Sequence, residues 1–295
     1  MPQKAARTAM GPTFQVALEQ LAPQEQRVIH DPIAYRLMPA PLQALVTLCR
    51  IGPLRRMLLR VADNQVPGVI GGVLCRKRYI DDRLQAALHA GITSLVILGA
   101  GFDTRAYRMP QLSSCQVYEV DLAENTEAKR DAVRRALGAV PPHVKIVAAD
   151  LDREDLLEAL QAAGHRAAQP AFYILEGVTQ YIPEGAVRRT FGVLAKTAPG
   201  SQLVFTYVRR DFLQGENLYG LPVLYKQTRG RGDFWQFGWD PEAVEPFLAS
   251  YGWKELEQVG RAQYEERYLR PLQRDLRVME VERAVLAERE GTFAT

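Results

Sequence analysis

Hydrophobic and polar positions along the chain change their pattern near residue 76. Before that point, residues 13–75 carry apolar positions at helical spacing between prolines, as in TFQVALEQLA, where Thr13 is a candidate N-cap. A further helix is predicted over 78–91, where it ends at a glycine. The first quarter of the chain is therefore expected to be helical.

Short apolar runs then alternate with helical segments. The runs are apolar throughout, which is typical of strands buried on both faces. Strand–helix alternation predicts a parallel sheet covered by helices on both sides. The predicted strands are 94–100, 116–121, 144–150, 171–177 and 201–208, and the predicted helices between them are 123–137, 153–163 and 184–198.

The alternation stops at residues 209–240, which mix glycine, aromatic and charged residues and resemble an insertion that covers something. A helix is expected over 241–251 and an extended segment over 253–260, and the tail 274–290 mixes β-branched residues with a helical end. We expect a single domain, 1–295, in four parts: a helical cap (1–75), a core (76–208), a lid (209–240) and a completion of the sheet (241–295).

Four arginines, Arg50, Arg55, Arg56 and Arg60, lie in one predicted helical stretch. Such a pattern indicates either a membrane-surface helix or, more often, the solvated face of a core helix. No apolar stretch reaches the length of a membrane span, and no signal core follows the N-terminus. We expect a cytoplasmic protein with no membrane partner.

Charge and cysteine content narrow the function further. Lysine and arginine number 37 against 34 acidic residues, so the net charge of +3 gives no reason to expect a nucleic-acid partner. Cys49, Cys75 and Cys115 are widely spaced and odd in number, which argues against zinc and against a disulfide framework. We expect all three to be small core residues.

The candidate chemistry begins at LVILGAGFDTRAYR, residues 95–108. Gly99 and Gly101 allow a ligand to approach the backbone closely after the first strand, where open parallel sheets bind ligands. The dinucleotide fingerprint has a third glycine where this chain has Thr104, which weakens an NAD interpretation.

Acids end the next three strands. Asp121 comes 22 residues after Gly99 and suits the ribose of a dinucleotide or of S-adenosylmethionine, or the N-cap of the helix that follows. Asp150, with the Leu151 amide, suits an adenine ring or a second helix cap. Glu176 would lie at the sulfonium and methionine end of such a ligand. Three acids on one sheet edge predict a pocket rim.

These motifs together resemble the leucine carboxyl methyltransferase family. The likeness rests on RKRYIDD, the glycine turn, YEVDLAENTEAKR, AADL and LEGVTQYI, and it extends to HDPIAYRL and to the tail. It is strongest to the bacterial branch of S-adenosylmethionine-dependent O-methyltransferases, which includes those of the tetracenomycin polyketide type. The resemblance implies a Rossmann-like class I methyltransferase fold: an α/β architecture with a mostly parallel, seven-stranded sheet.

The same resemblance implies roles for individual residues. Arg76, with Arg78 as its rival, would hold the methionine carboxylate, and Asp103 would pair with Arg105 to brace the turn. The implied cofactor contacts are Arg76 or Arg78 with the carboxylate, Gly99 and Gly101 with the methionine and ribose, Asp121 with the ribose, Asp150 and Leu151 with adenine, and Glu176 with the amino group or water.

Methyl transfer from a sulfonium needs no protein nucleophile, so we expect no catalytic acid, base or metal. A carboxylate acceptor is already ionised and attacks directly, whereas a phenol or alcohol often needs a base. No histidine falls at a predicted strand end or in the lid; surface or capping roles are expected for His89, His143 and His165, with His30 left open. This favours a small-molecule carboxylate; hydroxyl methylation, an inactive cofactor-binding scaffold and an NAD-dependent oxidoreductase are the alternatives.

Acceptor contacts are expected after the fourth strand and from the lid. Relatives are usually aliphatic where this chain has Thr179 and Gln180, and aromatic residues suit a flat apolar acceptor. The candidates are Thr179, Gln180, Tyr207, Tyr225 and Trp235. Several of the aromatic residues would instead anchor the lid against the core. The oligomeric state stays open.

Overall fold

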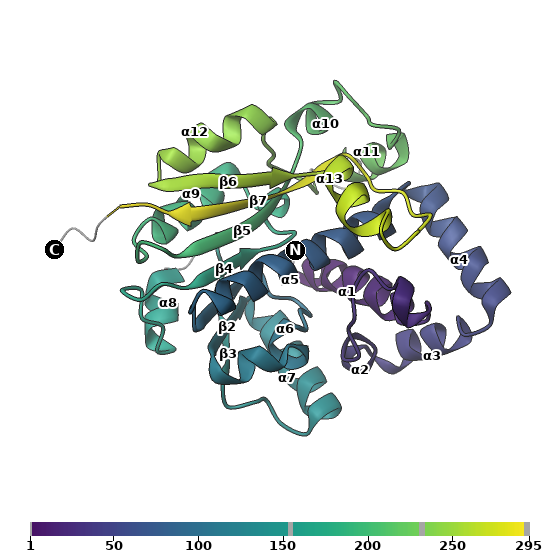
Figure 1. The fold of residues 1–295 in the computed structure, drawn as a ribbon, viewed down its shortest axis with the longest axis horizontal. Helices are drawn as coiled ribbons and strands as arrows, with labels where there is room; N and C mark the ends of the chain where they lie inside the picture. The colour runs from purple at the N-terminus through teal and green to yellow at the C-terminus, as the bar shows by residue number, and fades with distance from the viewer. Residues whose placement is uncertain (1, 153–155, 230–233, 292–295) are drawn as a thin grey trace.

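The computed structural model describes residues 2–152, 156–229 and 234–291, and its centre is a seven-stranded sheet (Figure 1). Across the sheet the strands follow the order β3-β2-β1-β4-β5-β7-β6. Their bounds are β1 Ser94–Leu98, β2 Gln116–Asp121, β3 Val144–Ala148, β4 Phe172–Leu175, β5 Gln202–Val208, β6 Trp253–Val259 and β7 Glu282–Arg289. The predicted α/β architecture with a mostly parallel, seven-stranded sheet is confirmed.

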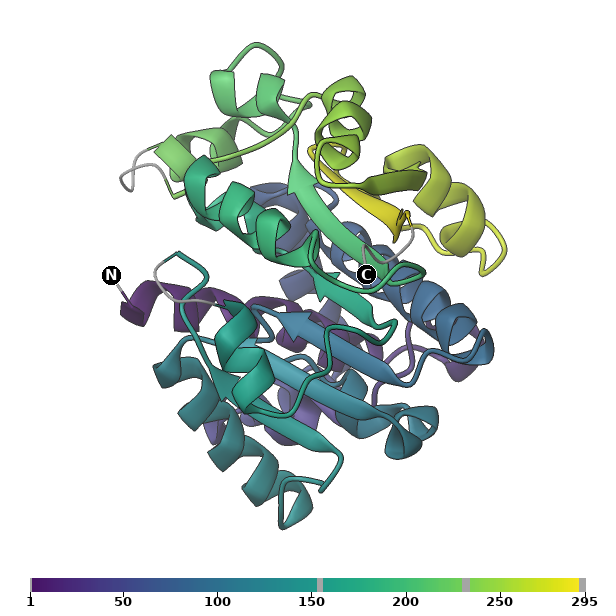
Figure 2. The ribbon, with the colours of Figure 1, turned by 90° about the vertical axis from the view of Figure 1, so that its left-hand side faces the viewer.

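The chain order reverses at β1, which places a binding crevice in the middle of the sheet. β1 pairs in parallel with β2 on one side and with β4 on the other, and β3 and β5 continue the parallel pairing. β7 runs antiparallel between β5 and β6. In open parallel sheets, ligands bind beyond the carboxyl ends of the strands at such a reversal. Figure 2 shows these strand ends on the side where α1 begins.

Successive residues of each strand pack into different cores, because side chains alternate across a sheet. Leu95 and Ile97 belong to the core beneath α5, whereas Tyr173 and Leu175 belong to the core on the opposite face. The continuous apolar runs seen in the sequence thus reflect a sheet that is covered on both sides.

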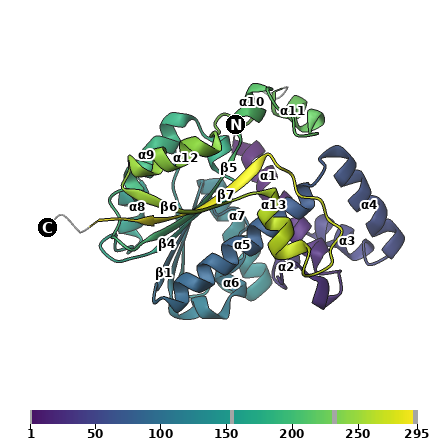
Figure 3. The same cartoon turned by 45° about the horizontal axis from the view of Figure 1, so that its top comes forward.

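Helices form the two outer layers (Figure 3). One face carries α5 Val69–His89, α6 Arg105–Arg108 and α7 Ala123–Leu137, and the other carries α8 Leu156–Ala162, α9 Glu184–Leu194 and α12 Val244–Ala249. Before α5 come α1 Pro2–Glu19, α2 Ala34–Leu37, α3 Ala40–Leu48 and α4 Gly52–Gln65; after β5 come α10 Arg210–Gln214 and α11 Pro222–Arg229, and α13 Arg261–Tyr264 follows β6.

Three local expectations from the sequence are wrong. Thr13 lies inside α1 rather than at its start, because the helix begins at Pro2 and continues through Pro12. The tail has no helical end; Glu282–Arg289 is a strand paired on both edges. The expected boundary between cap and core, at 75/76, falls inside the 21-residue helix α5. Residues 153–155 of the predicted helix 153–163 lie outside the described residues.

Candidate functional site

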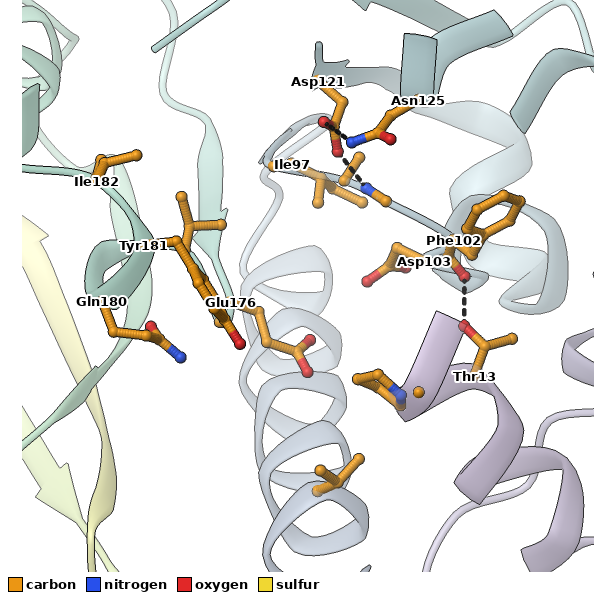
Figure 4. A pocket seen from close by; sticks show the side chains of 18 of the residues that line it. Thr13, Ile97, Phe102, Asp103, Asp121, Asn125, Glu176, Gln180, Tyr181 and Ile182 are labelled. Carbon is orange, nitrogen blue, oxygen red and sulfur yellow. Dashed lines mark hydrogen bonds between the residues drawn. The ribbon is translucent and has the colours of Figure 1, made fainter. Parts of the chain in front are cut away.

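A cavity of about 530 Å³ opens at the carboxyl ends of the central strands (Figure 4). Its walls come from segments far apart in the sequence. They include Gly11–Thr13 and Gln15 of α1; Val69, Val73, Arg76 and Lys77 of α5; Ile97 and Gly99–Asp103; Asp121, Leu122 and Asn125; Ala149–Leu151; Glu176–Val178 and Gln180–Ile182; Phe234–Gln236; and Met279 with Glu282. The glycine turn and the three strand-end acids predicted from the sequence all line this one cavity.

The turn after β1 requires glycine. Gly99 has φ +68°, and a Cβ added there would lie 2.3 Å from Cγ2 of Val178, closer than real atoms approach. Gly101 also has a positive φ, +42°. Both conformations favour glycine, the absence of a side chain at Gly99 lets Val178 pack against the turn, and both glycines line the cavity.

Asp121 ends β2 and closes the turn from the other side. Its Oδ2 accepts a hydrogen bond from the Gly101 amide at 2.6 Å, and its Oδ1 accepts from the Leu122 amide at 2.7 Å and from Nδ2 of Asn125 at 2.6 Å. α7 begins at Ala123 with Leu122 as its N-cap, so the alternative role of Asp121 as that cap is not observed. A carboxylate has about four acceptor positions, so one on Oδ2 stays available.

Asp150 and Leu151 follow β3 on the same edge. The Asp150 carboxylate accepts a hydrogen bond from the Asp152 amide at 2.9 Å. The Ala149 amide donates to the Asp121 carbonyl at 2.9 Å, which fixes the loop after β3 against the end of β2. The alternative role of Asp150 as a helix cap falls on residues 153–155, which lie outside the described residues.

Glu176 is held between three cations. Its Oε1 lies 2.9 Å from Nε of Arg76 and 3.3 Å from Nζ of Lys77, and its Oε2 lies 2.9 Å from Nη1 of Arg105. Burial alone would raise the pKa of Glu176, but Lys77, Arg105 and Arg76 together hold the pKa well below its usual range. Glu176 is therefore a fixed negative charge on the cavity wall.

Arg76 lines the cavity, whereas its rival Arg78 does not. Nε of Arg76 bonds Glu176, and its Nη1 donates to both carboxylate oxygens of Glu282 at 2.6 and 2.7 Å. Only Nη2 of this guanidinium is therefore left to donate to a ligand carboxylate, unless Glu176 or Glu282 moves away. The prediction of Arg78 as a site residue is wrong. Its side chain is 44% exposed and pairs with Asp82 at 2.8 Å, outside the cavity.

The expected pairing of Asp103 with Arg105 is confirmed. The Arg105 side chain is completely buried, and its Nη1 contacts Oδ2 of Asp103 while its Nε lies 2.7 Å from Oδ1 of Asp81. Burial would raise the pKa of Asp103, but Arg105 and Lys77 outweigh it and the pKa is lowered. This buried pair braces the segment between β1 and α6.

Two of the five candidate acceptor contacts, Gln180 and Trp235, line the cavity, and three do not. Thr179 is buried and donates to the Thr206 carbonyl at 2.8 Å. Tyr207 is buried in the core beside Trp239, with ring centroids 5.7 Å apart. Tyr225 packs over Phe212 inside the lid region. The predictions for Thr179, Tyr207 and Tyr225 are therefore wrong: each side chain packs or bonds within the fold, and none lines the cavity.

Histidine is absent from the described lining of the cavity. His30 and His89 are exposed, and His143 lies within 3.2 Å of the Ala106 carbonyl. The expected surface or capping role of His165 is wrong, because this side chain is buried with its Nε2 3.0 Å from the Tyr173 hydroxyl. Burial lowers the pKa of His165, which keeps the ring neutral in the core.

Several lining residues were not expected from the sequence. Gln15 comes from α1, Lys77 from α5, and Met279 and Glu282 from the end of the chain. Glu282 reaches Arg76 across 206 residues of sequence. Lys77 lies inside the RKRYIDD motif, but nothing in that motif assigns it a place on the cavity wall. Gln15, Met279 and Glu282 reach the cavity through the packing of distant elements, such as the insertion of β7 between β5 and β6.

Comparison with known proteins places this geometry in a family context. Residues 9–195 match the profile of the leucine carboxyl methyltransferase family. A provisionally named S-adenosyl-L-methionine-dependent methyltransferase from Mycobacterium avium is 34% identical over 213 residues, 68% of this chain and 67% of the relative. One of the same description from Streptomyces avermitilis is 32% identical over 72% of each chain.

Solved structures agree on the fold. A provisionally named methyltransferase from Thermobifida fusca superposes with a TM-score of 0.56, covering 81% of this chain and 89% of its own, at 19% identity. At that identity the likeness supports the fold alone.

Proposed function

Because the chain belongs to the leucine carboxyl methyltransferase family and is an S-adenosyl-L-methionine-dependent methyltransferase, we propose that it methylates a small-molecule carboxylate to a methyl ester. Bound S-adenosylmethionine supplies a methyl group activated by a sulfonium. The protein's own contribution is binding, orientation and the electrostatics of the cavity.

The charges of the cavity suit this cofactor. Among the described lining residues, five acids accompany two bases: Asp103, Asp121, Asp150, Glu176 and Glu282 against Arg76 and Lys77. A cavity with an excess of negative charge favours a ligand that carries net positive charge, as S-adenosylmethionine does. The bare backbone at Gly99 offers the close approach that an extended ligand needs beside the switch point.

The proposed cofactor contacts follow from these positions. Asp121 accepts a hydrogen bond from one ribose hydroxyl at its available position on Oδ2, and Asp150 with the Leu151 amide binds the adenine edge. Nη2 of Arg76 meets the methionine carboxylate. The oxygens of Glu176 already contact three cations. Glu176 therefore attracts the methionine amino group through its negative charge and not through a direct hydrogen bond.

The proposal of a carboxylate acceptor depends most on the ion-paired state of the cavity acids. Glu176 and Asp103 have lowered pKa values, which makes them weak bases. Both oxygens of Glu282 bind Arg76. Burial raises the pKa of Tyr181, which keeps its hydroxyl protonated. A carboxylate acceptor needs no proton removed at neutral pH, so these groups serve it as they stand.

The chemistry of the product tests this proposal. The protein would be incubated with S-adenosylmethionine labelled in its methyl group and a panel of aromatic carboxylic acids, beside the matching phenols and alcohols. We expect label to enter the acids and mild alkali to release it as methanol, because esters hydrolyse and ethers do not.

Three other results would redirect the proposal. Alkali-stable label in the phenols would mean hydroxyl methylation. Binding of S-adenosylhomocysteine without transfer to any acceptor would favour a cofactor-binding scaffold. Stabilisation by NAD in place of S-adenosylhomocysteine would remove the methyltransferase interpretation altogether.

Gln180 is the side chain best placed to recognise an acceptor. It is 3% exposed, lines the cavity, and its Oε1 has no hydrogen-bond partner among the described residues. Figure 4 shows its amide beside the Tyr181 side chain. A buried amide left without a partner costs stability unless a ligand satisfies it. We assign Oε1 of Gln180 to a hydrogen-bond donor of the acceptor molecule, an N–H or O–H group.

Gln180→Leu is expected to lower kcat/KM for the acceptor roughly 5-fold, because one hydrogen bond of about 1 kcal/mol is lost. The affinity for S-adenosylhomocysteine should not change. Gln236→Leu is the matched control, since Gln236 also lines the cavity but its Nε2 donates to the Tyr181 carbonyl at 3.0 Å. Equal losses in both variants would contradict a specific role for Gln180.

A further inference from the structure

The stretch from Pro32 to Ala62 contains five arginines and no acidic residue. Two of the arginines are used within the fold: Arg36 donates to the Ala136 carbonyl, and Nη1 of Arg55 donates to the Leu21 carbonyl at 2.6 Å. The others, Arg50, Arg56 and Arg60, are exposed and form no ion pair or hydrogen bond with the described part of the chain. Among the described residues this leaves three positive charges without a partner, two on α4 and one, Arg50, in the turn before it.

Exposed apolar side chains gather in the same place. Leu48, Ile51, Met57 and Val61 are between 51% and 57% exposed. They are four of the six large hydrophobic residues that are exposed in the described residues. Clusters of exposed apolar residues mark interaction surfaces, whereas single ones need no explanation. We call residues 48–61 the basic arm.

The helical spacing of α4 brings both kinds of residue to one face. Arg56 and Arg60 are one turn apart, as are Met57 and Val61, so the two pairs run side by side along the helix. The opposite face of the helix packs on the core through the half-buried Leu58 and Leu59. No residue of α4 is fully buried, and the helix lies at the edge of the molecule (Figures 1 and 3).

We propose that the basic arm docks on the surface of an anionic lipid bilayer, which departs from the expectation of no membrane partner drawn from the sequence. Its arginines complement lipid phosphates, and Leu48, Ile51, Met57 and Val61 supply the apolar surface that enters the boundary of the acyl chains. An acidic protein partner would match the arginines alone. No described helix is long and apolar enough to cross a membrane, so the arm lies on the surface. This inference does not rest on the proposed reaction.

Docking there would bring the cavity close to the bilayer. α4 ends at Gln65, and Val69 and Val73 of the following helix line the cavity. An acceptor that partitions into membranes would then reach the cavity along this side of the molecule.

Co-sedimentation with vesicles tests the proposal on the full chain. Wild-type protein is expected to sediment with vesicles of phosphatidylcholine mixed with phosphatidylglycerol, and not with phosphatidylcholine alone. Arg50→Ala/Arg56→Ala/Arg60→Ala should lower the partition coefficient roughly 100-fold, which is three arginines at about 1 kcal/mol each. Met57→Ser/Val61→Ser should also weaken binding, by the loss of inserted apolar surface.

The control removes the same net charge elsewhere. Arg135→Ala/Arg166→Ala/Arg270→Ala changes three exposed arginines outside the arm and should leave vesicle binding intact. An equal loss in this control, or no sedimentation of the wild type, would overturn the proposal. Full vesicle binding by Met57→Ser/Val61→Ser would contradict the insertion of apolar side chains into the bilayer. Tighter binding to polyglutamate than to vesicles would indicate an acidic protein partner instead of a bilayer. Unchanged melting temperatures of the variants would exclude misfolding.

Discussion

Replacing Arg105 with methionine is expected to lower the free energy of unfolding by about 3–5 kcal/mol. The guanidinium is completely buried and contacts Asp81, Asp103 and Glu176 at once. Glu176 keeps Arg76 and Lys77, and Asp81 keeps Arg108, whose Nη2 lies 2.7 Å from its Oδ2. The carboxylate of Asp103 loses its only ion pair among the described residues and keeps the more distant attraction of Lys77, and a poorly compensated buried charge is costly.

Urea unfolding of the wild type, Arg105→Met, Asp103→Asn, their double variant and one surface control measures this effect. In Arg105→Met/Asp103→Asn the orphaned charge is gone, so part of the stability should return, which makes the double variant more stable than the two single effects predict. Arg188→Met is the surface control, because Arg188 and Glu184 are both about half exposed and such pairs contribute about 0–1 kcal/mol. A similar loss at both arginines would contradict a special role for the buried one.

The same variants should differ in their response to acid. Asp103 and Glu176 have pKa values in the folded protein below those of the unfolded chain, which lie near 4. Their contribution to stability is therefore present above the unfolded pKa and is lost as the pH falls through the folded pKa. In Arg105→Met these pKa values move back up, so the gap in stability between wild type and variant should narrow below about pH 4.

Most of the framework follows from local signals in the sequence. The predicted strands and helices of residues 94–208 agree with the structure apart from a few terminal residues and 153–155, because each apolar run is long enough to cross a sheet covered on both sides. Since parallel strands end on one edge, Asp121, Asp150 and Glu176 were expected to meet, and all three line one cavity.

The alternation of side chains along β5 also distinguishes a core residue from a cavity residue. Leu203, Phe205 and Tyr207 alternate along β5 and share one buried face, so the position of Tyr207 already indicates a core residue. The lid, residues 209–240, has no regular spacing of apolar positions. Its sequence therefore does not show that Trp235 lines the cavity and that Tyr225 does not.

Long-range partners leave no local trace at all. Arg76 was expected to be free for a ligand carboxylate, yet Glu282 occupies its Nη1 from a strand 206 residues away. Gln15 reaches the cavity because α1 packs against α5, although 49 residues separate the two helices in the sequence. Such contacts depend on the order in which elements stack, which the hydrophobic pattern of each element does not encode.

Asp121→Ala is expected to weaken the binding of S-adenosylhomocysteine by roughly 10- to 150-fold, since at least one charge-assisted hydrogen bond of about 1.5–3 kcal/mol is lost. The one free acceptor position on Oδ2 supports one ribose hydroxyl directly. A second hydroxyl would have to replace the hydrogen bond from Nδ2 of Asn125 or from the Gly101 amide. Asn125→Ala is therefore expected to cost much less affinity than Asp121→Ala.

Thermal unfolding with and without S-adenosylhomocysteine measures the difference. At a ligand concentration 100-fold above the wild-type Kd, linkage stabilises the wild type by about 2.7 kcal/mol, and a 100-fold weaker site retains only about 0.4 kcal/mol. Asp131→Ala removes an equally charged, exposed side chain from α7 and should keep the full shift. Because the Asp121 carboxylate also holds the turn amide of Gly101, the variant without ligand should melt lower than wild type. If the ligand still stabilises Asp121→Ala in full, the ribose does not lie at the end of β2, and the cofactor must bind elsewhere in the cavity.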